Sequence, residues 1–533
     1  MKNKYLFLLL ISALSFGQIS QVKDINPGSA NSSTPTNLFD FNGTLFFRAT
    51  NGANGVELWK SDGTETGTVM VKDINTTTSA ASNSNAANFT AFNNQIYFTA
   101  SNGTTANGSE LWKTDGTSAG TVMVKDINAG TANSNPQLFT IINPTTMLFS
   151  ATDGVGGVEL WKTDGTESGT VNVIDQSGTG NSISWIENLN GNGIYSQLVV
   201  TTTGRELYKS DGTPITSGNI IDINSGTGHG VGTTYFKNEN TIYFQGNSGT
   251  TGFELWKTDG TAPGTSLVKD INPGTNGSAP IRFANFGNIT FFRANGPNGV
   301  ELWLTDGTEA GTIEVADINP GTGNSTPDQI QSVNGVLYFF ASDDGTNYDF
   351  YKYDSSKLTK LADFNAPTST ATVDYIELNG IVYFTADSNA DTLRELWQTD
   401  GTSAGTILVS SLVSGSINPT GVSSLTKIGN KLFFAATGND GQELFTYTPP
   451  TLSVKDQDKL EVVAVYPNPS DGNFFINNAD NETVKYEVFD ILGKKQAAGK
   501  TNGNSLHLNL KTGLYILKLT KNSQTSTTKI IIK

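Results

Sequence analysis

Short hydrophobic segments recur along most of the chain, and each of them ends at a cluster of Gly, Asn, Asp or Pro. One unit shows the pattern clearly, with segments at 88–92, 95–100, 109–113 and 121–127. All four are rich in β-branched and aromatic residues, which is typical of β-strands, and the polar residues between them are typical of turns. No helical period of 3.6 residues runs through these units. The pattern therefore predicts four short antiparallel strands in each unit.

One stretch, residues 57–64, organises this pattern because its sequence Glu-Leu-Trp-Lys-Ser-Asp-Gly-Thr returns at regular intervals. Further copies begin at Glu110, Glu159, Glu206, Glu254, Glu301 and Glu395, and two weaker copies begin at Asp349 and Glu443. Eight intervals separate Glu57 from Glu443, so the period is about 48 residues. A fixed period of this size indicates a repeat architecture.

Four strands in about 48 residues are typical of one blade of a β-propeller. A lone strand at 21–25 precedes the first unit, whereas the last unit supplies only three strands and ends at 443–447. The first strand would complete the last blade and remove two exposed edges. We therefore expect an all-β fold, a propeller of about nine four-stranded units. Eight blades with one displaced unit, or an open array, are the alternatives.

A second region follows the repeats. Pro449 and Pro450 stop the last strand, and the polar segment 449–460 is typical of a linker, which leaves 18–448 as the propeller. Residues 461–533 then contain five or more strand-like runs, which predict a small β-sandwich.

The chain begins like an exported protein. Residues 1–17 combine a basic start, a short apolar run and small residues before a cleavage point at Gln18, which predicts a signal peptide. No later stretch approaches 18 apolar residues, so we expect no transmembrane segment.

Composition narrows the chemistry. The net charge of −16 argues against nucleic acid and anionic membranes as partners. Cysteine is absent, which excludes disulfides, thiolate nucleophiles and cysteine metal sites. With only His229 and His507, histidine-based zinc sites are nearly excluded too.

The Glu and Trp of each copy are the first candidate residues. On a strand both point to one face, and a large aromatic side chain at a fixed depth in every unit favours a core layer. A buried carboxylate needs hydrogen-bond donors, so we interpret the Glu as an anchor, with a ligand-binding ring of carboxylates as the alternative. This structural interpretation covers Glu57, Trp59, Glu110, Trp112, Glu159, Trp161, Glu254, Trp256, Glu301, Trp303, Glu395 and Trp397.

The Asp-Gly-Thr segment after each Trp is typical of a turn that joins two strands, since Asp can accept hydrogen bonds from the turn backbone and Gly allows positive φ. The alternative is a calcium loop, although the acids do not follow the alternating pattern of calcium ligands. We expect no cofactor. These turns contain Asp62, Asp115, Asp164, Asp259, Asp306 and Asp400.

The loops give weaker signals. The b–c and d–a loops (second to third strand, and fourth strand to the next unit) should share one face, and they vary most, so this is the expected binding face. His229 lies in a Gly-rich loop, but that loop lacks the lysine and the strand-to-helix setting of a phosphate site, so we expect a loop histidine without a special role.

The repeats at 21–448 resemble the ELWxxDGT repeat proteins of Bacteroidetes-type bacteria. Six copies keep both Glu-Leu-Trp and Asp-Gly-Thr, and Tyr208 replaces Trp in a seventh. This resemblance implies a repeat fold and assigns no activity.

A second set of motif residues lies in 461–533: Tyr466, Pro467, Asn468, Pro469, Gly472, Asp490, Gly493, Gly513, Tyr515 and Lys529. In order and spacing these residues resemble a type A sorting domain of the type IX secretion system. The resemblance implies export to the periplasm and passage across the outer membrane by the type IX machinery. It also implies removal of the domain, with release or attachment to a surface polysaccharide.

We therefore expect a secreted or surface-attached propeller that binds a glycan or a surface protein without catalysing a reaction. One alternative is a polysaccharide-cleaving propeller with carboxylates near its axis, although acids are too frequent for spacing to single out a catalytic pair. Another is a purely structural surface protein.

Overall fold

The computed structural model describes residues 17–28, 31–77, 82–103, 108–175, 180–200, 203–354, 357–366, 375–387, 393–412, 419–450, 465–476, 483–490, 494–501, 503–521 and 524–533. Contacts divide the chain into a large unit, Phe16–Pro449, and a second unit that contains Pro450–Lys533. The predicted signal peptide, apart from Gly17, and the linker beyond Pro450 lie outside the described residues.

The large unit is all-β, and its described residues form four-stranded antiparallel sheets. Sheets one to three consist of β2 (Thr36–Phe41), β3 (Thr44–Thr50), β4 (Val56–Ser61) and β5 (Val69–Lys72); β6 (Ala87–Phe92), β7 (Gln95–Ser101), β8 (Ser109–Thr114) and β9 (Val122–Lys125); and β10 (Gln137–Asn143), β11 (Thr146–Ala151), β12 (Glu159–Thr163) and β13 (Val171–Ile174).

Sheets four to six continue the same order of strands. They consist of β14 (Ser182–Leu189), β15 (Asn192–Val199), β16 (Gly204–Ser210) and β17 (Gly218–Ile221); β18 (Val231–Asn238), β19 (Thr241–Gly246), β20 (Glu254–Thr258) and β21 (Ser266–Lys269); and β22 (Ile281–Phe286), β23 (Ile289–Gly296), β24 (Gly299–Thr305) and β25 (Ile313–Ala316).

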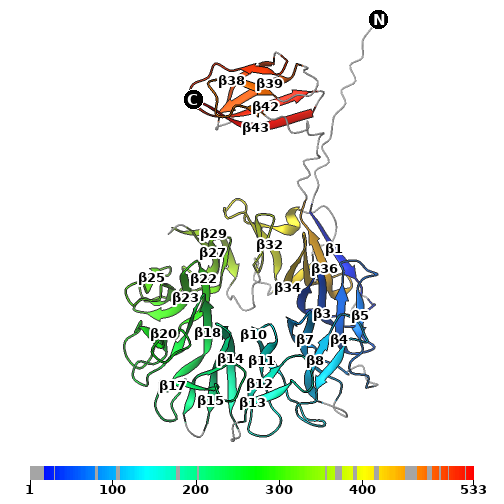
Figure 1. The fold of residues 1–533 in the computed structure, drawn as a ribbon, viewed down its shortest axis with the longest axis vertical. Helices are drawn as coiled ribbons and strands as arrows, with labels where there is room; N and C mark the ends of the chain where they lie inside the picture. The colour runs from blue at the N-terminus through cyan, green and yellow to red at the C-terminus, as the bar shows by residue number, and fades with distance from the viewer. Residues whose placement is uncertain are drawn as a thin grey trace. The chain divides into compact units, whose positions relative to one another are not determined.

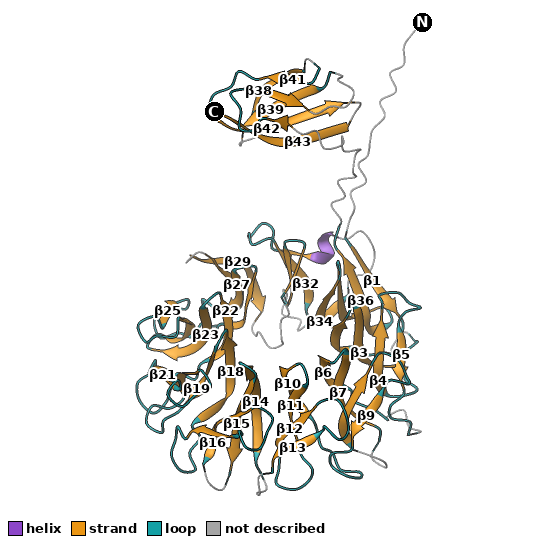
Figure 2. Cartoon of the chain, viewed as in Figure 1, coloured by secondary structure: helices purple, strands orange, loops and turns teal. Residues whose placement is uncertain are grey.

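Sheets seven to nine complete the described part of this unit. They consist of β26 (Asp328–Val333), β27 (Val336–Ala341), β28 (Tyr348–Asp354) and β29 (Lys357–Ala366); β30 (Ile376–Leu378), β31 (Ile381–Ala386), β32 (Glu395–Thr399) and β33 (Ile407–Leu408); and β34 (Thr420–Ile428), β35 (Lys431–Gly438), β36 (Gly441–Thr448) and β1 (Gln18–Lys23). The 3-10 turn η1 (Val409–Leu412), purple in Figure 2, is the one helical element among the described residues.

The predicted pairing of the first strand with the last repeat is confirmed. β1 runs antiparallel to β36, with Gln18 opposite Thr448 and Gln21 opposite Phe445. The ninth sheet therefore combines strands from the two ends of the large unit.

The sheets surround a common centre (Figure 1). First strands contact first strands of neighbouring sheets, as β22 contacts β26, β10 contacts β14, and β2 contacts both β6 and β34. The contact between β2 and β34 brings the first sheet against the ninth. A shared core supports this contact, since Val22, Phe433 and Leu444 of the ninth sheet pack with Phe47 and Trp59 of the first.

Lysines at the ends of fourth strands add a second kind of contact between neighbouring sheets. Each ammonium group donates to the carbonyl of the threonine that precedes the fourth strand of the next sheet. The junction between the ninth and first sheets has the same contact as the others. The pairs are Lys72–Thr121 (2.7 Å), Lys125–Thr170 (2.9 Å), Lys269–Thr312 (2.8 Å) and Lys23–Thr68 (2.9 Å).

The fourth repeat forms a regular four-stranded sheet although its sequence departs from the repeat pattern. Its segments 185–189 and 193–203 differ from the other repeats, and yet β14 and β15 pair along their length and occupy the usual first and second places. Alternating apolar residues preserve the strands here, because Trp185, Ile194 and Leu207 are all buried.

The second unit contains two described sheets. One has β37 (Val465–Tyr466), β38 (Asn473–Ile476) and β41 (Ser505–His507). The other has β40 (Lys495–Lys500), β39 (Lys485–Asp490), β42 (Gly513–Lys521) and β43 (Gln524–Ile532). The two sheets share one core, in which Phe474 and Leu506 of the first pack with Val488, Leu517 and Ile530 of the second.

Candidate functional site

The repeated glutamates begin or nearly begin the third strand of each sheet, and their carboxylates accept hydrogen bonds from the loop that follows the fourth strand. Glu254 accepts from the backbone N–H of Ile271 (2.9 Å) and from both the N–H (2.7 Å) and the hydroxyl (2.5 Å) of Ser278. The side chain is fully buried. Glu110 and Glu301 make the same three bonds, each within its own repeat. These carboxylates hold a loop in place.

Burial has the largest effect on the pKa of the Glu57 and Glu206 carboxyl groups. It raises the pKa of Glu57 to about 7, although hydrogen bonds from Ile74 and Ser84 lower it. Glu206 behaves similarly, since burial raises its pKa to about 7 against hydrogen bonds from Ile223 and Gly230. In the third sheet, Glu159 also accepts from the side-chain amide of Asn172. Glu395 is buried at the start of β32.

The last glutamate uses donors from the other end of the large unit. Glu443 accepts from the N–H of Ile25 (3.0 Å), the N–H of Ser33 (3.0 Å) and the hydroxyl of Ser33 (2.6 Å). These residues occupy the places that Ile271 and Ser278 have beside Glu254. The N-terminal segment thus completes the ninth sheet with a strand and with a carboxylate anchor.

The repeated tryptophans pack between sheets. Trp303 is buried in a cluster with Val268 and Ile271 of the preceding sheet, and Trp112 packs on Val71 and Ile74 in the same way. Trp59 and Trp161 are equally buried, while Trp256 and Trp397 are half-buried. Each tryptophan therefore belongs to the packing between neighbouring sheets.

The Asp-Gly-Thr turns are self-contained. Oδ1 of Asp62 accepts from the N–H (2.9 Å) and the hydroxyl (2.7 Å) of Thr64, and these bonds lower the pKa of Asp62. A side chain at Gly67 would collide with the Asp62 carboxylate, since its Cβ would lie 2.0 Å from Oδ1. The same bonds to threonine recur at Asp115, Asp164, Asp259, Asp306 and Asp400.

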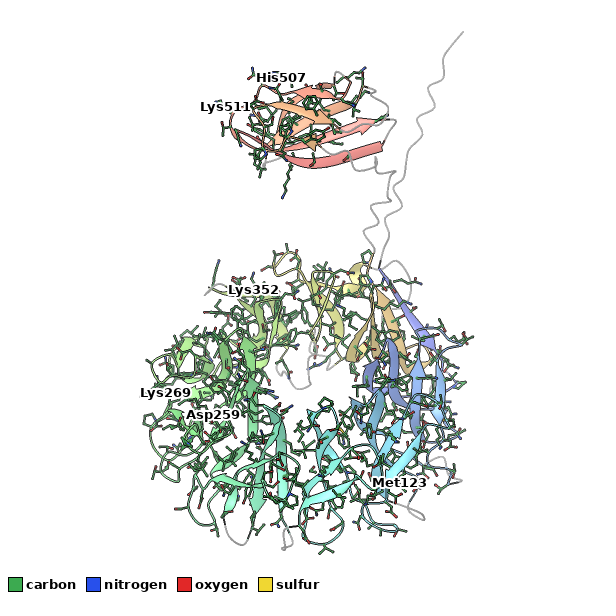
Figure 3. The ribbon with its side chains drawn as sticks, viewed as in Figure 1. Met123, Asp259, Lys269, Lys352, His507 and Lys511 are labelled. Carbon is green, nitrogen blue, oxygen red and sulfur yellow. The ribbon has the colours of Figure 1, made fainter. Side chains whose placement is uncertain are left out.

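Figure 3 marks Asp259, one of these turn residues, and Lys269 on the outermost strand of the same sheet. Over the described ranges, no three His, Cys, Asp or Glu side chains gather in a way that could hold a metal ion.

The sorting-motif residues join the ends of the second unit. The Asn468 side chain accepts from the N–H of Ile531 (2.9 Å) and donates to the carbonyl of Lys529 (2.7 Å), which ties the Tyr466–Pro469 segment to β43. Gly472 allows a close approach to Leu508, whose carbonyl would lie 2.4 Å from an added Cβ.

Three other motif residues, Asp490, Gly513 and Tyr515, lie on β39 and β42. Asp490 accepts from the N–H of Lys494 (2.9 Å), and Gly493 lies outside the described residues. Tyr515, two residues after Gly513, donates to the carbonyl of Lys511 (3.0 Å).

The seventh sheet departs from the repeat. Asp349 replaces the glutamate, and Lys360 on β29 pairs with it (2.5 Å) and with Asp343 (3.0 Å). Asp349 also accepts from the N–H of Phe364 (3.2 Å). Burial raises the pKa of Asp349 to about 6; Lys360 lowers it, and Asp363 raises it further. A charged pair here takes the place of the neutral serine donors.

A second departure lies one sheet earlier, on inner strands. Arg282 of β22 binds Asp328 of β26 through Nε (2.6 Å), and Arg293 of β23 approaches the other oxygen of Asp328 (3.9 Å). Arg282 has a left-handed backbone, with φ of 58°. Its side chain is 48% exposed, whereas that of Arg293 is 20% exposed. We call Arg282, Arg293 and Asp328 the arginine cluster.

Two tyrosines lie beside the arginine cluster. Tyr348 hydrogen-bonds to Thr326 through its hydroxyl (2.5 Å) and lies near Arg293. Tyr375 is buried, and its hydroxyl has no hydrogen-bond partner among the described residues. Burial raises the pKa of Tyr375 far above its usual value, Asp328 raises it further and Arg394 lowers it. Both charges therefore lie near this phenol.

Sequence reasoning singled out none of these residues. A usable signal was the rarity of arginine, since the chain has five, at 48, 205, 282, 293 and 394. The histidine in the Gly-rich loop has a local role, because Nδ1 of His229 accepts from the N–H of Arg205 (3.2 Å). No helix in the described part is long and apolar enough to cross a membrane.

Comparison with known proteins places the second unit. Residues 464–533 match the family of secretion system C-terminal sorting domains. The chain therefore carries a sorting domain for type IX secretion and is exported to the cell surface or secreted.

A curated relative matches a shorter stretch. Over 108 residues the chain is 31% identical to the ulvan lyase NLR42 of Nonlabens ulvanivorans. The matched stretch covers 19% of this chain and 20% of that protein. The chain thus matches about a fifth of the length of this relative.

Solved structures give weak likenesses. The chain is similar to a prolyl endopeptidase (12% identity, TM-score 0.38, 72% of this chain and 55% of that one). It is also similar to PorZ, a surface component of the type IX secretion system of Porphyromonas gingivalis (12% identity, TM-score 0.25, 94% of this chain and 86% of that one). A third similar structure is the GH74 xyloglucanase of Xanthomonas campestris (11% identity, TM-score 0.29, 76% of this chain and 81% of that one).

Proposed function

We propose that this exported protein is a non-enzymatic binding scaffold for a glycan, held at the cell surface or released, and that its large unit is a closed nine-bladed propeller of the ELWxxDGT type. Three features support closure: the β1–β36 pairing, the Glu443 anchor on Ile25 and Ser33, and the Lys23–Thr68 contact. The first two repeat what other repeats do within themselves, and the third repeats what other sheets do with their neighbours.

The binding role rests on how the carboxylates are used. Repeated glutamates are buried and engaged by loop donors, and turn aspartates are engaged by their own threonines. These groups have structural duties, so catalysis by a ring of axial carboxylates receives no support from them. The departures from the repeat lie in the sixth and seventh sheets, where the arginine cluster offers a partly exposed cation on an inner strand. This exposed cation is the observation that carries the proposal.

A glycan array tests the proposal directly. The purified full-length chain should bind a defined subset of glycans, and Arg282→Gln should reduce the signal in a variant that circular dichroism shows to be folded. Absence of binding to any glycan, with the protein folded, would contradict the proposal.

Polysaccharide cleavage is the second candidate. The partial similarity to an ulvan lyase favours it, as does the group of Asp343, Asp349, Tyr351 and Lys360 in the seventh sheet. Incubation with acidic and neutral polysaccharides, followed by measurement of new reducing ends and unsaturated products, separates the two functions. Product formation that Lys360→Met abolishes would establish the enzyme, and intact polysaccharide would favour the scaffold.

A further inference from the structure

We infer that the arginine cluster and Tyr375 form a binding site for the carboxylate of an acidic sugar, a uronic acid residue within a glycan. The inference rests on the proposed glycan-binding function and names the class of glycan. Four observations carry it: the local excess of cations, the unpaired donors of Arg293, the exposure of Arg282 and the buried hydroxyl of Tyr375.

Charge is the first observation. The chain has a net charge of −16 and only five arginines, yet three of them gather around Asp328 and Tyr375. One aspartate faces the guanidinium groups of both Arg282 and Arg293, so positive charge exceeds negative charge within the arginine cluster. Cations that are partly removed from water attract an anion more strongly than surface cations do.

The second observation comes from a matched pair of arginines inside the molecule. Arg48 and Arg293 occupy the same place in the first and sixth sheets, each opposite the first residue of its inner strand. In the first sheet that residue is Thr36, whose hydroxyl accepts from Nε of Arg48 (2.7 Å). In the sixth sheet it is Ile281, which has no side-chain acceptor.

Arg293 therefore turns to the next sheet, where Asp328 at 3.9 Å is its one charged contact among the residues that the structure describes. This distance is longer than a hydrogen bond, so most of the five N–H donors of Arg293 have no acceptor in the described structure. Burial lowers the pKa of Arg293, the charge of Asp328 raises it, and the nearby charge of Arg282 lowers it. A second carboxylate at this point would satisfy these donors and reduce the repulsion between the two arginines.

The third and fourth observations concern access and geometry. Arg282 lies on an inner strand with nearly half of its side chain exposed, so a ligand can reach the arginine cluster. Tyr375 is only 5% exposed, and its hydroxyl, free of any described partner, lies where the charges of Asp328 and Arg394 both act on it. A planar guanidinium matches a carboxylate through two parallel hydrogen bonds. The tyrosine hydroxyl adds a donor for a neighbouring sugar oxygen.

Calorimetric titration of the full-length chain with tetragalacturonate tests the inference. We expect binding that weakens as NaCl is raised from 50 to 300 mM, roughly as screening requires. Maltotetraose, which is neutral, should not bind this site. Arg293→Gln should weaken tetragalacturonate binding about tenfold or more, the size of one charge-assisted hydrogen-bond pair.

Arg48→Gln is the matched control, because it removes an arginine from the same place in another sheet. It should leave the affinity unchanged. Tyr375→Phe removes one buried oxygen and should weaken binding about threefold or more, the low end for a single hydrogen bond. This variant also serves if Arg293→Gln does not fold.

Equal affinity of the parent and folded Arg293→Gln or Tyr375→Phe chains would overturn the inference. So would stronger binding of a sulfated oligosaccharide, or equal binding of tetraglutamate, since these would assign the site to another anion or to an acidic peptide. Binding of neutral glycans alone would overturn the inference while leaving the proposed glycan-binding function intact. Failure to bind any glycan would contradict both.

Discussion

The fifth and seventh sheets meet the same structural demand by different chemistry. Each buries a carboxylate at the start or near the start of its third strand, at Glu254 and at Asp349. In the fifth sheet the carboxylate accepts from neutral donors, the backbone of Ile271 and both groups of Ser278. In the seventh it pairs with the ammonium group of Lys360. The comparison shows that neutral backbone and serine donors can hold a buried carboxylate in one sheet after another, and that no additional cation is then needed.

The difference changes what each sheet responds to. The loop after the fourth strand sets the positions of the neutral donors. The glutamate therefore links the third strand to the loop of its own repeat. The shorter aspartate at 349 reaches a lysine on β29, at a place that Met70 and Met123 occupy in the first two sheets. An ion pair is sensitive to pH and salt, whereas bonds from serine and backbone respond much less.

The largest expected effect comes from removing the anchor whose donors are most distant in sequence. Deleting residues 18–26 removes β1 and the Ile25 donor of Glu443, together with the buried side chain of Val22. We expect a loss of about 3–5 kcal/mol, with melting lowered by roughly 5–10 °C and more aggregation from the exposed β36 edge. Scanning calorimetry and light scattering measure both effects. Unchanged melting would show that the ninth sheet does not depend on β1.

A direct comparison of the two anchors should give a smaller effect. Glu254→Ala leaves the donors of Ile271 and Ser278 buried without an acceptor, so the unfolding free energy should fall by about 2–3 kcal/mol. Asp349→Ala should cost less, about 1–2 kcal/mol, because Lys360 keeps Asp343 as a partner and only the N–H of Phe364 loses its acceptor. Urea denaturation of both variants gives the ranking, and a larger loss for Asp349→Ala would reverse our interpretation of the seventh sheet.

The pH dependence of the seventh sheet sharpens the comparison further. Lys360→Met installs the residue of the first two sheets and removes the cation that lowers the pKa of Asp349. A carboxyl whose folded pKa is raised loses stability as pH climbs from its unfolded value to its folded one. The variant should therefore be about 1–2 kcal/mol less stable than the parent at pH 8 and nearly equal to it at pH 4.

Melting curves at both pH values test this expectation, with Met123→Leu as the control that should show no dependence on pH. An equal loss at pH 4 and pH 8 would mean that Lys360 acts through packing, and Asp349 would have no part in it.

The smallest effect is expected at the turns that the seventh sheet lacks. Asp115→Asn keeps an oxygen that can accept from Thr117, so the change in stability should stay within about 0.5 kcal/mol at pH 7. Hydrogen bonds from Thr117 lower the pKa of Asp115, so its contribution exists above its unfolded pKa and disappears as pH falls through the lower folded value. Acid titration of the melting temperature would show a slightly flatter profile in the variant.

The sequence alone predicted those features of the fold that recur in every repeat. The strand segments, the antiparallel order and the pairing of β1 with β36 follow from the alternation of apolar segments and turns, which recurs often enough to be unambiguous. It also identified the sorting-domain motifs, where the side chain of Asn468 binds the backbone of β43 and Gly472 allows a close approach of Leu508.

The arginine cluster could not be predicted in this way. Arg282 and Asp328 are separated by nearly one full repeat, and they meet because neighbouring inner strands lie side by side. No local pattern encodes that contact. Nor does the sequence of the sixth repeat show that Ile281, in the place of Thr36, deprives Arg293 of the acceptor that Arg48 has.

The position of β36 has a mechanical consequence. The chain leaves the large unit after Thr448, so a pull transmitted from that end acts first along β36. This strand is hydrogen-bonded to β35 on one side and to β1 on the other. An edge strand can peel away one bond at a time, but a strand held on both sides must shear two rows of bonds together. The strand contributed by the other end of the unit therefore places the loaded strand inside a sheet, where it resists force best.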